Sequence, residues 1–293
     1  MTEQPIIYLI DASVYIFRAW HSIPDHMKTA QGEPCNAVYG FAGFIADMLK
    51  RSNPDPLLVA FDESLSSSFR NEIFPDYKAN RPPAPIELKR QFQWCQQLCE
   101  ALGLHWQADS SWEADDLIGT WSAMAKSRGR AVSIVTRDKD LAQLITPQDQ
   151  LWDFAADKRL DSDGIKAQFG VWPEQIADYL ALTGDAVDNI PGVAGVGPKA
   201  ASALLQAFDT LEQVYERLDE VPDLAVRGAK SLKLKLEAGR EQAFLSRRLT
   251  GIPRDLPLPE PVWQRRPVDH AALQRLCDEL AFGSGIRQRL LAF

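Results

Sequence analysis

Aspartates stand at the ends of three short apolar segments of this sequence. The segments have the composition of β-strands and cover residues 6–10, 57–61 and 131–136. Asp11 and Asp62 directly follow the first two, and Asp138 and Asp140 follow the third. If the segments are parallel strands of one sheet, their carboxyl ends meet at one edge, where ligands bind. A lone strand-end aspartate is commonly a helix N-cap or a turn residue, but three such strand ends together predict a common site.

Two further groups of acids lie at the ends of predicted helices. Glu113, Asp115 and Asp116 open one helix, and Glu113 shares a face with Asp116 because they are three residues apart. Acids are favoured in a first helical turn, so the helix dipole alone explains one or two of them. Asp185 and Asp188 have the same spacing but follow the end of a helix, where the dipole opposes acids. A structural role is therefore less expected for this second group.

These nine acids predict a divalent metal centre. So much negative charge in one place would be self-repelling unless cations neutralised it. Oxygen ligands without a nearby histidine or cysteine favour Mg²⁺ or Mn²⁺ over Zn²⁺. Two such ions about 4 Å apart are a common device for phosphodiester hydrolysis, because one prepares the attacking water and the other stabilises the leaving oxygen. We therefore expect a Mg²⁺-dependent nuclease.

A glycine-rich segment between two predicted helices indicates a phosphate-binding hairpin. It covers residues 189–199 and contains Gly192, Gly195 and Gly197, with Lys199 in the following helix. Glycine lets the backbone approach a phosphate closely, and N–H groups at a helix N-terminus bind phosphate without reading a base. The alternative is a plain glycine-capped turn. Because the segment adjoins the last acidic group, we favour phosphate binding, of the helix-hairpin-helix type, to DNA.

A long loop after the second apolar segment carries basic and aromatic residues. It covers about 64–90 and includes Tyr77, Lys78 and Arg81. Loops of this length are uncommon in compact domains unless they act on something. The loop would bring positive charge to a transition state that metals do not fully surround, and Tyr77 could stack on an unpaired base. The alternative is a solvated loop.

The remaining pattern predicts an α/β core followed by a helical region. Helical patterns over 37–50, 86–102 and 113–126 separate the apolar segments, as in a parallel sheet covered on both faces. From about Pro173 onward the pattern is entirely helical. We therefore expect a catalytic core over 1–172 and a helical DNA-binding region over 173–293.

Composition places the chain among ordinary globular proteins. Its 293 residues are 45% hydrophobic and 25% charged, and no apolar stretch approaches the roughly 18 residues of a membrane span. The net charge of −8 argues superficially against a nucleic-acid partner, yet basic residues gather over 78–90 and 227–248. The four cysteines form no CxxC pair. With no leader sequence recognised at the start, we expect a cytoplasmic monomer with reduced core thiols.

The motifs together resemble those of the 5′ nuclease family. In order they are Ile10-Asp11, Tyr39-Gly40-Phe41, Ala60-Phe61-Asp62, Phe69-Arg70, Tyr77-Lys78-Ala79-Asn80-Arg81, Glu113-Ala114-Asp115-Asp116, Thr136-Arg137-Asp138-Lys139-Asp140, Thr183-Gly184-Asp185 and 192–199. The family includes the 5′ to 3′ exonuclease domain of bacterial DNA polymerase I, stand-alone bacterial and phage exonucleases, and flap endonucleases. The resemblance covers 6–293. The chain ends soon after Phe282-Gly283-Ser284, as expected of the free-standing form.

The resemblance implies a PIN-like core, an arch over the active site and a helix-three-turn-helix element that holds duplex DNA. It implies action on DNA with 5′ ends, flaps or branched junctions, in replication and repair. A first metal site would come from Asp11, Asp62, Glu113, Asp115 and Asp116. A second would come from Asp138, Asp140, Asp185 and Asp188.

The resemblance also assigns roles outside the acids. Lys78 and Arg81 fall on arch positions that meet the scissile phosphate, and K⁺ is a further possible ligand of the hairpin. Arg137 departs from the family pattern, in which we expect a small residue, and its bulk could alter metal affinity.

Two other classes of function remain open. A non-catalytic, structure-specific DNA-binding protein on the same fold is disfavoured by the full set of acids, and an assay with Mg²⁺ against EDTA separates the two. A phosphatase acting on small esters is disfavoured because the first strand is not followed by a DxD motif and because the hairpin begins at Gly192. A Walker lysine loop is also missing, so ATP use is not expected.

Overall fold

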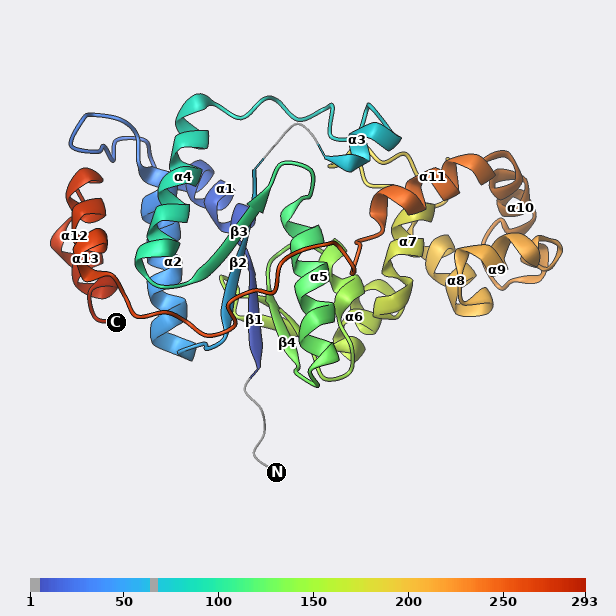
Figure 1. Ribbon diagram of the computed structural model, residues 1–293. Coiled ribbons are helices and arrows are strands. Elements are labelled where there is room, and N and C mark those ends of the chain that lie inside the picture. Colours follow the sequence, from blue (N-terminus) through green and yellow to red (C-terminus); the bar gives the residue numbers. More distant parts are fainter. Residues whose placement is uncertain (1–5, 64–67) are drawn as a thin grey trace.

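A computed structural model of the chain describes residues 6–63 and 68–293, and it shows an α/β core with a helical region beside it (Figure 1). The core contains a six-stranded sheet of order β3-β2-β1-β4-β5-β6. The strands are β1 (Ile7–Asp11), β2 (Leu57–Asp62), β3 (His105–Asp109), β4 (Val132–Val135), β5 (Gln150–Asp153) and β6 (Lys158–Leu160). The first five pair in parallel, and β6 is antiparallel to β5. The predicted α/β class is confirmed.

The three apolar segments form β1, β2 and β4 as predicted, whereas the sequence prediction missed β3, β5 and β6. Strand β3 has the sequence His-Trp-Gln-Ala-Asp and is only partly buried along its whole length. It lies at one edge of the sheet, so it lacks the apolar run of a central strand. Strands β5 and β6 are only four and three residues long, which is too short to give a clear periodic signal.

Helices cover both faces of the sheet, as the alternating side chains of its strands require. Ile10, Val59 and Phe61 pack in one buried cluster with the first helices, which are α1 (Ala12–Ser22), α2 (Asn36–Ser52) and α4 (Ile86–Ala101). Leu9 and Leu58 pack in a second cluster with α5 (Ala114–Ser127) on the other face. The amino end of α5 therefore lies beside the carboxyl ends of the strands (Figure 1).

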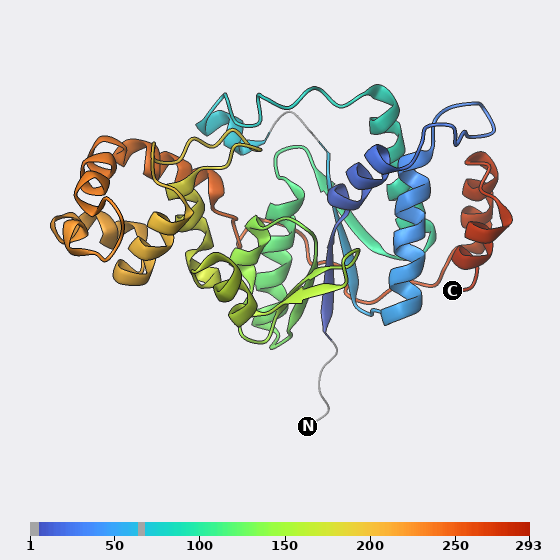
Figure 2. The same cartoon turned by 180° about the vertical axis from the view of Figure 1, so that it is seen from behind.

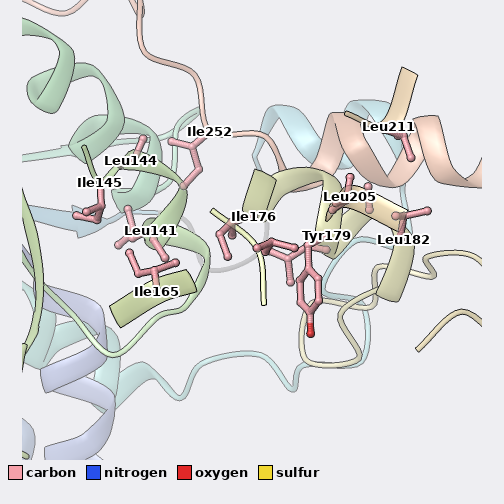
Figure 3. Packing of buried hydrophobic residues seen from close by; sticks show 14 of the residues in the cluster. Leu141, Leu144, Ile145, Ile165, Ile176, Tyr179, Leu182, Leu205, Leu211 and Ile252 are labelled. Atoms are coloured by element: carbon pink, nitrogen blue, oxygen red, sulfur yellow. The ribbon is translucent and has the colours of Figure 1, made fainter. Parts of the chain in front are cut away.

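The helical region shares its core with the α5 face of the sheet. Its elements are η1 (Asp140–Leu144), α6 (Ser162–Phe169), η2 (Pro173–Gln175), α7 (Ile176–Thr183), α8 (Pro198–Phe208), α9 (Leu211–Glu216), η3 (Leu218–Asp223), α10 (Ala229–Ala238) and α11 (Arg240–Thr250). Figure 3 shows the junction, where Leu141, Ile165 and Ile176 pack in a cluster that continues to Tyr179 and Leu205. This continuous packing fixes the helical region relative to the sheet.

After α11 the chain returns along the core to α12 (His270–Glu279) and α13 (Ser284–Leu290). Figures 1 and 2 show these last helices beside α2 and α4, at the opposite end of the molecule from α8 to α10. The division at residue 172 stays a prediction. None of the helices in 6–63 and 68–293 has the length and hydropathy to cross a membrane.

Residues 68–85, between β2 and α4, pass over the carboxyl edge of the sheet (Figure 1). They include α3 (Phe69–Ile73), followed by an irregular stretch over 74–85. Residues 64–67 of the predicted arch lie outside the described residues. The four cysteines are buried and free, as predicted for core thiols.

Candidate active site

Four aspartates lie together at the carboxyl edge of the sheet. Asp11 and Asp62 end β1 and β2, Asp138 follows β4, and Asp115 is in the first turn of α5. Burial, and then repulsion by Asp62 and Asp138, raises the pKa of Asp11 to about 7. Burial and repulsion by Asp138 and Asp11 likewise raise the pKa of Asp115 well above its ordinary value. The strand-end acids Asp11, Asp62 and Asp138 thus lie close together, and Asp115 joins them from α5.

Hydrogen bonds hold these aspartates at fixed places on the sheet edge. The Thr136 hydroxyl donates to Asp11 Oδ2 at 2.8 Å and accepts from the Asp138 N–H at 2.9 Å. The Ala114 N–H, at the start of α5, donates to Asp62 Oδ1 at 2.8 Å. This role of Thr136 was not predicted from the sequence. Its position between a strand and Asp138 is the feature that could have indicated it.

Asp140 and Asp185 extend the cluster toward the helical region. Burial and repulsion by Asp138 raise the pKa of Asp140 to about 7. Its Oδ1 atom is buried, accepts no hydrogen bond and lies 3.5 Å from Lys139 Nζ. Asp185 is different: burial opposes its ionisation, but the hydrogen bond and charge of Lys139, together with hydrogen bonds from the N–H groups of Val187 and Asp188, hold its pKa below the ordinary value.

The predicted cations of the arch reach Glu113 and Asp188. Lys78 Nζ lies 2.8 Å from Glu113 Oε1 and 3.7 Å from Asp188 Oδ2, and Arg81 forms an ion pair with Asp188. Burial works against the charge of Lys78, but Glu113, Asp188 and other acidic groups together outweigh burial, so the Lys78 pKa is well above its ordinary value. Lys78 has a φ of 55°, in the left-handed region that non-glycine residues rarely adopt. Such backbone strain gathers at functional sites.

Tyr77 does not fit its predicted role as a stacking platform. Its side chain is buried, with 4% exposure, beside Ile190 and Leu249. Its hydroxyl lies 3.0 Å from Glu113 Oε2 and 3.2 Å from Asp188 Oδ2. The ring is therefore not available to an unpaired base in this arrangement, and it instead positions the carboxylates.

Two loops hold the arch cations in place. The Lys78 N–H donates to the Asp188 carbonyl at 2.9 Å. Asn80 donates to the Ala186 carbonyl at 2.8 Å, and Asn189 donates to the Asp76 carbonyl at 2.7 Å. The predicted catalytic lysine and arginine are thus fixed against the 185–189 loop, which also carries the last two acids.

Asp116, which was predicted to be a metal ligand, is held by hydrogen bonds within the protein. The guanidinium of Arg70 donates to both of its carboxylate oxygens, at 2.7 and 2.9 Å, and the Glu113 N–H donates to Oδ2 at 3.0 Å. The residue is 0% exposed. Both oxygens are thus engaged within the protein, and Asp116 orients Arg70 and Glu113. Its predicted role as a metal ligand stays a prediction.

The glycine-rich hairpin lies between α7 and α8 as predicted, but its glycines differ in role. Gly192 is buried and its N–H donates to Ser246 Oγ at 3.1 Å, so this N–H is not available to a phosphate. A Cβ there would lie 2.2 Å from the Gly184 nitrogen, which explains the glycine by close backbone contact. Gly195, Gly197 and Lys199 are exposed, with Gly197 as the N-cap of α8.

Two family models match the chain. One, described as 5′-3′ exonuclease, N-terminal resolvase-like domain, matches residues 6–170, and the other, described as 5′-3′ exonuclease, C-terminal SAM fold, matches residues 171–270. The chain belongs to the 5′-3′ exonuclease family. A 5′-3′ exonuclease of Buchnera aphidicola is 32% identical, over 87% of this chain and 89% of its own length.

Other members of the 5′-3′ exonuclease family are much longer. DNA polymerase I of Pseudomonas aeruginosa is 44% identical over 88% of this chain, but this chain spans only 28% of that polymerase. Among solved structures, T5 5′-exonuclease with bound zinc has a TM-score of 0.66 at 20% identity, covering 98% of this chain and 97% of its own. The catalytic core of Rad2 in complex with DNA substrate has a TM-score of 0.66 at 14% identity, covering 99% and 92%. These structures share the fold.

The acids of this family member form two groups. Asp11, Asp62, Asp115, Asp138 and Asp140 are the sheet-edge acids. Glu113, Asp116, Asp185 and Asp188 are the paired acids, each of which accepts a hydrogen bond from a lysine or arginine, whereas Asp140 Oδ1 lies 3.5 Å from Lys139 Nζ and accepts no hydrogen bond. Among the described residues, no three acidic, histidine or cysteine side chains are arranged closely enough to hold a metal ion as they stand. The donor chemistry of the sheet-edge acids nevertheless fits a hard divalent cation. All are carboxylates, burial and repulsion by other acids raise the pKa values of Asp11, Asp115, Asp138 and Asp140, and one oxygen of Asp140 has no hydrogen-bond partner.

Arg137 contacts an acid outside these groups. Its Nε lies 3.2 Å from Asp153 Oδ2, at the end of β5, and its side chain is half exposed. Its effect on metal affinity stays a prediction.

Proposed function

We propose that this member of the 5′-3′ exonuclease family hydrolyses phosphodiester bonds in DNA at or near 5′ ends, including flaps and branched junctions, and requires Mg²⁺ or Mn²⁺. The observation that carries the proposal is the convergence of sheet-edge acids from β1, β2, β4 and α5 beneath a segment bearing Lys78 and Arg81. Membership of the family supports the reaction class.

The sheet-edge acids would hold the divalent cations. Asp11, Asp62 and Asp115 lie nearest the strand ends, and Asp138 and Asp140 extend toward the helical region. When bound, such ions activate water and stabilise the leaving oxygen. Thr136 joins the Asp11 carboxylate to the backbone of Asp138, so the two chain segments that carry these acids are held together. Glu113 and Asp188 contribute by holding the arch cations near this edge.

Lys78 and Arg81 would contact the reacting phosphate. Both are cations that are paired with carboxylates. A phosphate that enters the site is also an anion, so it can take the place of these carboxylates as the partner of Lys78 and Arg81. Fixed cations beside developing negative charge stabilise a transition state at little cost in reorganisation. The strained backbone at Lys78 indicates that its place is imposed by the surrounding contacts.

The hairpin would hold the duplex away from the cleavage site. Gly195 and Gly197 are exposed at the amino end of α8, where backbone N–H groups favour anions. Lys199 and Lys235 are also exposed, and Lys235 Nζ donates to the Gly195 carbonyl at 3.0 Å. These groups would bind the phosphate backbone of the duplex, and such contacts carry no base readout. Binding of K⁺ at this loop, a monomeric state and a cytoplasmic location stay predictions.

The test is a cleavage assay on 5′-labelled flap, nicked and single-stranded DNA, with Mg²⁺ or EDTA, read as product lengths on a gel. We expect short 5′ products with Mg²⁺ and none in EDTA. Binding of flap DNA without cleavage in Mg²⁺ or Mn²⁺ would instead indicate the non-catalytic DNA-binding protein. Cleavage that persists in EDTA would contradict the role of the sheet-edge acids.

A further inference from the structure

Arg70 of α3 is a buried arginine whose guanidinium joins separate parts of the molecule. It is 2% exposed. Toward α5 it donates to Glu113 Oε2 at 3.1 Å and to both oxygens of Asp116. Toward the helical region its Nε donates to the Leu249 carbonyl at 2.8 Å and its terminal nitrogen donates to the Gly251 carbonyl at 3.3 Å. The acceptors thus belong to the acidic turn of α5 and to the end of α11.

The geometry of these contacts requires arginine. A buried charge is tolerated only when it is paired and its donors are satisfied, and the contacts to α5 and α11 use every N–H direction of the planar guanidinium. The lysine ammonium has its three donors on a single atom, so it cannot span both sets of acceptors. A lysine at position 70 would keep the positive charge but would not join α5 to α11.

The link continues from α11 to the hairpin. Ser246, in the middle of α11 and 0% exposed, accepts from the Gly192 N–H at 3.1 Å. One turn later the Leu249 carbonyl accepts from Arg70, which in turn holds Glu113. A hydrogen-bonded path of buried groups therefore runs from the hairpin, through α11 and Arg70, to the first turn of α5.

We propose that Arg70 is a positioning residue that makes the orientation of Glu113, and with it the arch lysine Lys78, depend on whether duplex DNA is held at the hairpin. Lys78 is involved because its ammonium pairs with Glu113. This inference rests on the proposed function only in taking duplex DNA as the ligand of the hairpin. A chain of hydrogen bonds does not by itself show that two sites are energetically coupled. The test therefore measures the first turn of α5 while DNA occupies the hairpin.

The test is hydrogen exchange of the amides in 113–117 with and without a nicked duplex carrying a 5′ flap, in EDTA. In the wild-type protein we expect bound DNA to slow this exchange by about tenfold, within the range of coupling between sites. In the Arg70→Lys variant DNA should still bind, but the exchange of 113–117 should no longer change. Unchanged exchange in the wild type, or protection that persists in Arg70→Lys, would overturn the proposal.

Arg287→Lys is the matched control. Arg287 also donates to one carboxylate, Asp278 at 2.6 Å, and to two carbonyls, at 3.2 and 3.4 Å, but it joins α13 to α12 far from the hairpin. The same substitution there should lower the melting temperature without removing the DNA-dependent protection. Loss of protection in both variants would show that Arg70 has only a general structural role.

A second variant covers the case in which Arg70→Lys does not fold. Ser246→Ala removes the hydroxyl at the hairpin end of the path and leaves every contact of Arg70 with α5 in place. We expect DNA-dependent protection of 113–117 to fall in this variant, and full protection would contradict the path. Because exchange is measured in EDTA, this result is separate from cleavage: absent cleavage in Mg²⁺ would sink the proposed function, whereas absent protection would sink only this inference.

Discussion

The sheet-edge acids and the paired acids lie side by side but are treated differently by the protein. Burial and repulsion by other acids raise the pKa values of Asp11, Asp115 and Asp140. In the paired group burial opposes ionisation, but contacts with Lys78 and Arg70 together hold the pKa of Glu113 below its ordinary value, and contacts with Lys139 and backbone N–H groups do the same for Asp185. At Asp116 burial prevails over Arg70 and the pKa is raised. The first group therefore favours an external cation, whereas each acid of the second group is already hydrogen-bonded to a lysine or arginine of the protein.

The acids therefore have two tasks, metal binding and the positioning of lysine and arginine side chains, which the sequence does not distinguish. Before the contacts are known, all nine acids look like metal ligands. In the structure the paired acids place Arg70, Lys78, Arg81 and Lys139 around the sheet edge. Substitutions in the two groups should therefore have different consequences, and the following predictions use that contrast.

The largest effect is expected from Asp62→Asn, in the sheet-edge group. Loss of one ligand charge should lower the single-turnover cleavage rate by about a thousandfold or more, on the scale of a catalytic group acting in a metal site. Asp188→Ala, in the paired group, should lower the rate less and leave flap binding in Ca²⁺ nearly unchanged. Equal losses of rate in the two variants would remove the distinction between the groups.

The next effect concerns Lys78, which the paired acids hold in place. If its ammonium contacts the phosphate mainly in the transition state, Lys78→Ala should lower the single-turnover rate by about thirty- to a thousandfold, or about 2 to 4 kcal/mol. The binding constant in Ca²⁺ at the same salt concentration is the control. A rate within about threefold of wild type would show that Lys78 only neutralises Glu113.

A smaller effect is expected at the hairpin, which lies outside both groups of acids. Gly195 has a φ of 78°, and a Cβ there would lie 2.9 Å from Lys235 Nζ. Gly195→Val should weaken duplex binding by about tenfold, equivalent to one charged hydrogen bond, and equally for duplexes of different sequence. A change in sequence preference would count against phosphate recognition by this loop.

The last effect is on stability and not on cleavage, and it follows from the raised pKa values. Asp11 and Asp140 have pKa values of about 7 in the folded protein, against 3.8 ordinarily, so between these values the folded chain binds more protons than the unfolded chain. The free energy of unfolding should therefore fall as the pH rises through this window. Thermal denaturation in EDTA at about pH 5 and about pH 8 measures this fall, which should shrink in Asp140→Asn and on addition of Mg²⁺. A fall of equal size in Asp140→Asn would refute the role of this group.

The sequence predicts the sheet-edge group well because local features determine it. A strand-end aspartate is placed by the strand before it, and parallel strands bring their carboxyl ends together. Asp115 is placed in the same way by the first turn of α5. The central strands and long helices are predictable for a similar reason, since their apolar periodicity is local.

The paired group was less predictable because its partners are distant in the sequence. Arg70 contacts Asp116, 46 residues away, and the Leu249 carbonyl, 179 residues away. Gly192 seemed to be a phosphate-binding residue because its partner Ser246 lies 54 residues further on. Tyr77 was predicted to stack on a base because nothing in the loop sequence reveals that its ring packs against Ile190 and Leu249.

The most direct test of the central claim is calorimetric titration of the protein with Mn²⁺ at about neutral pH, without DNA. Asp138 lies between the acids of β1 and α5 on one side and Asp140 on the other, so Asp138→Asn should abolish or greatly weaken Mn²⁺ binding. Asp278→Asn, on α12, is the control and should bind Mn²⁺ as the wild type does. Equal Mn²⁺ binding by Asp138→Asn and the wild type would contradict the claim that the sheet-edge acids form the metal site.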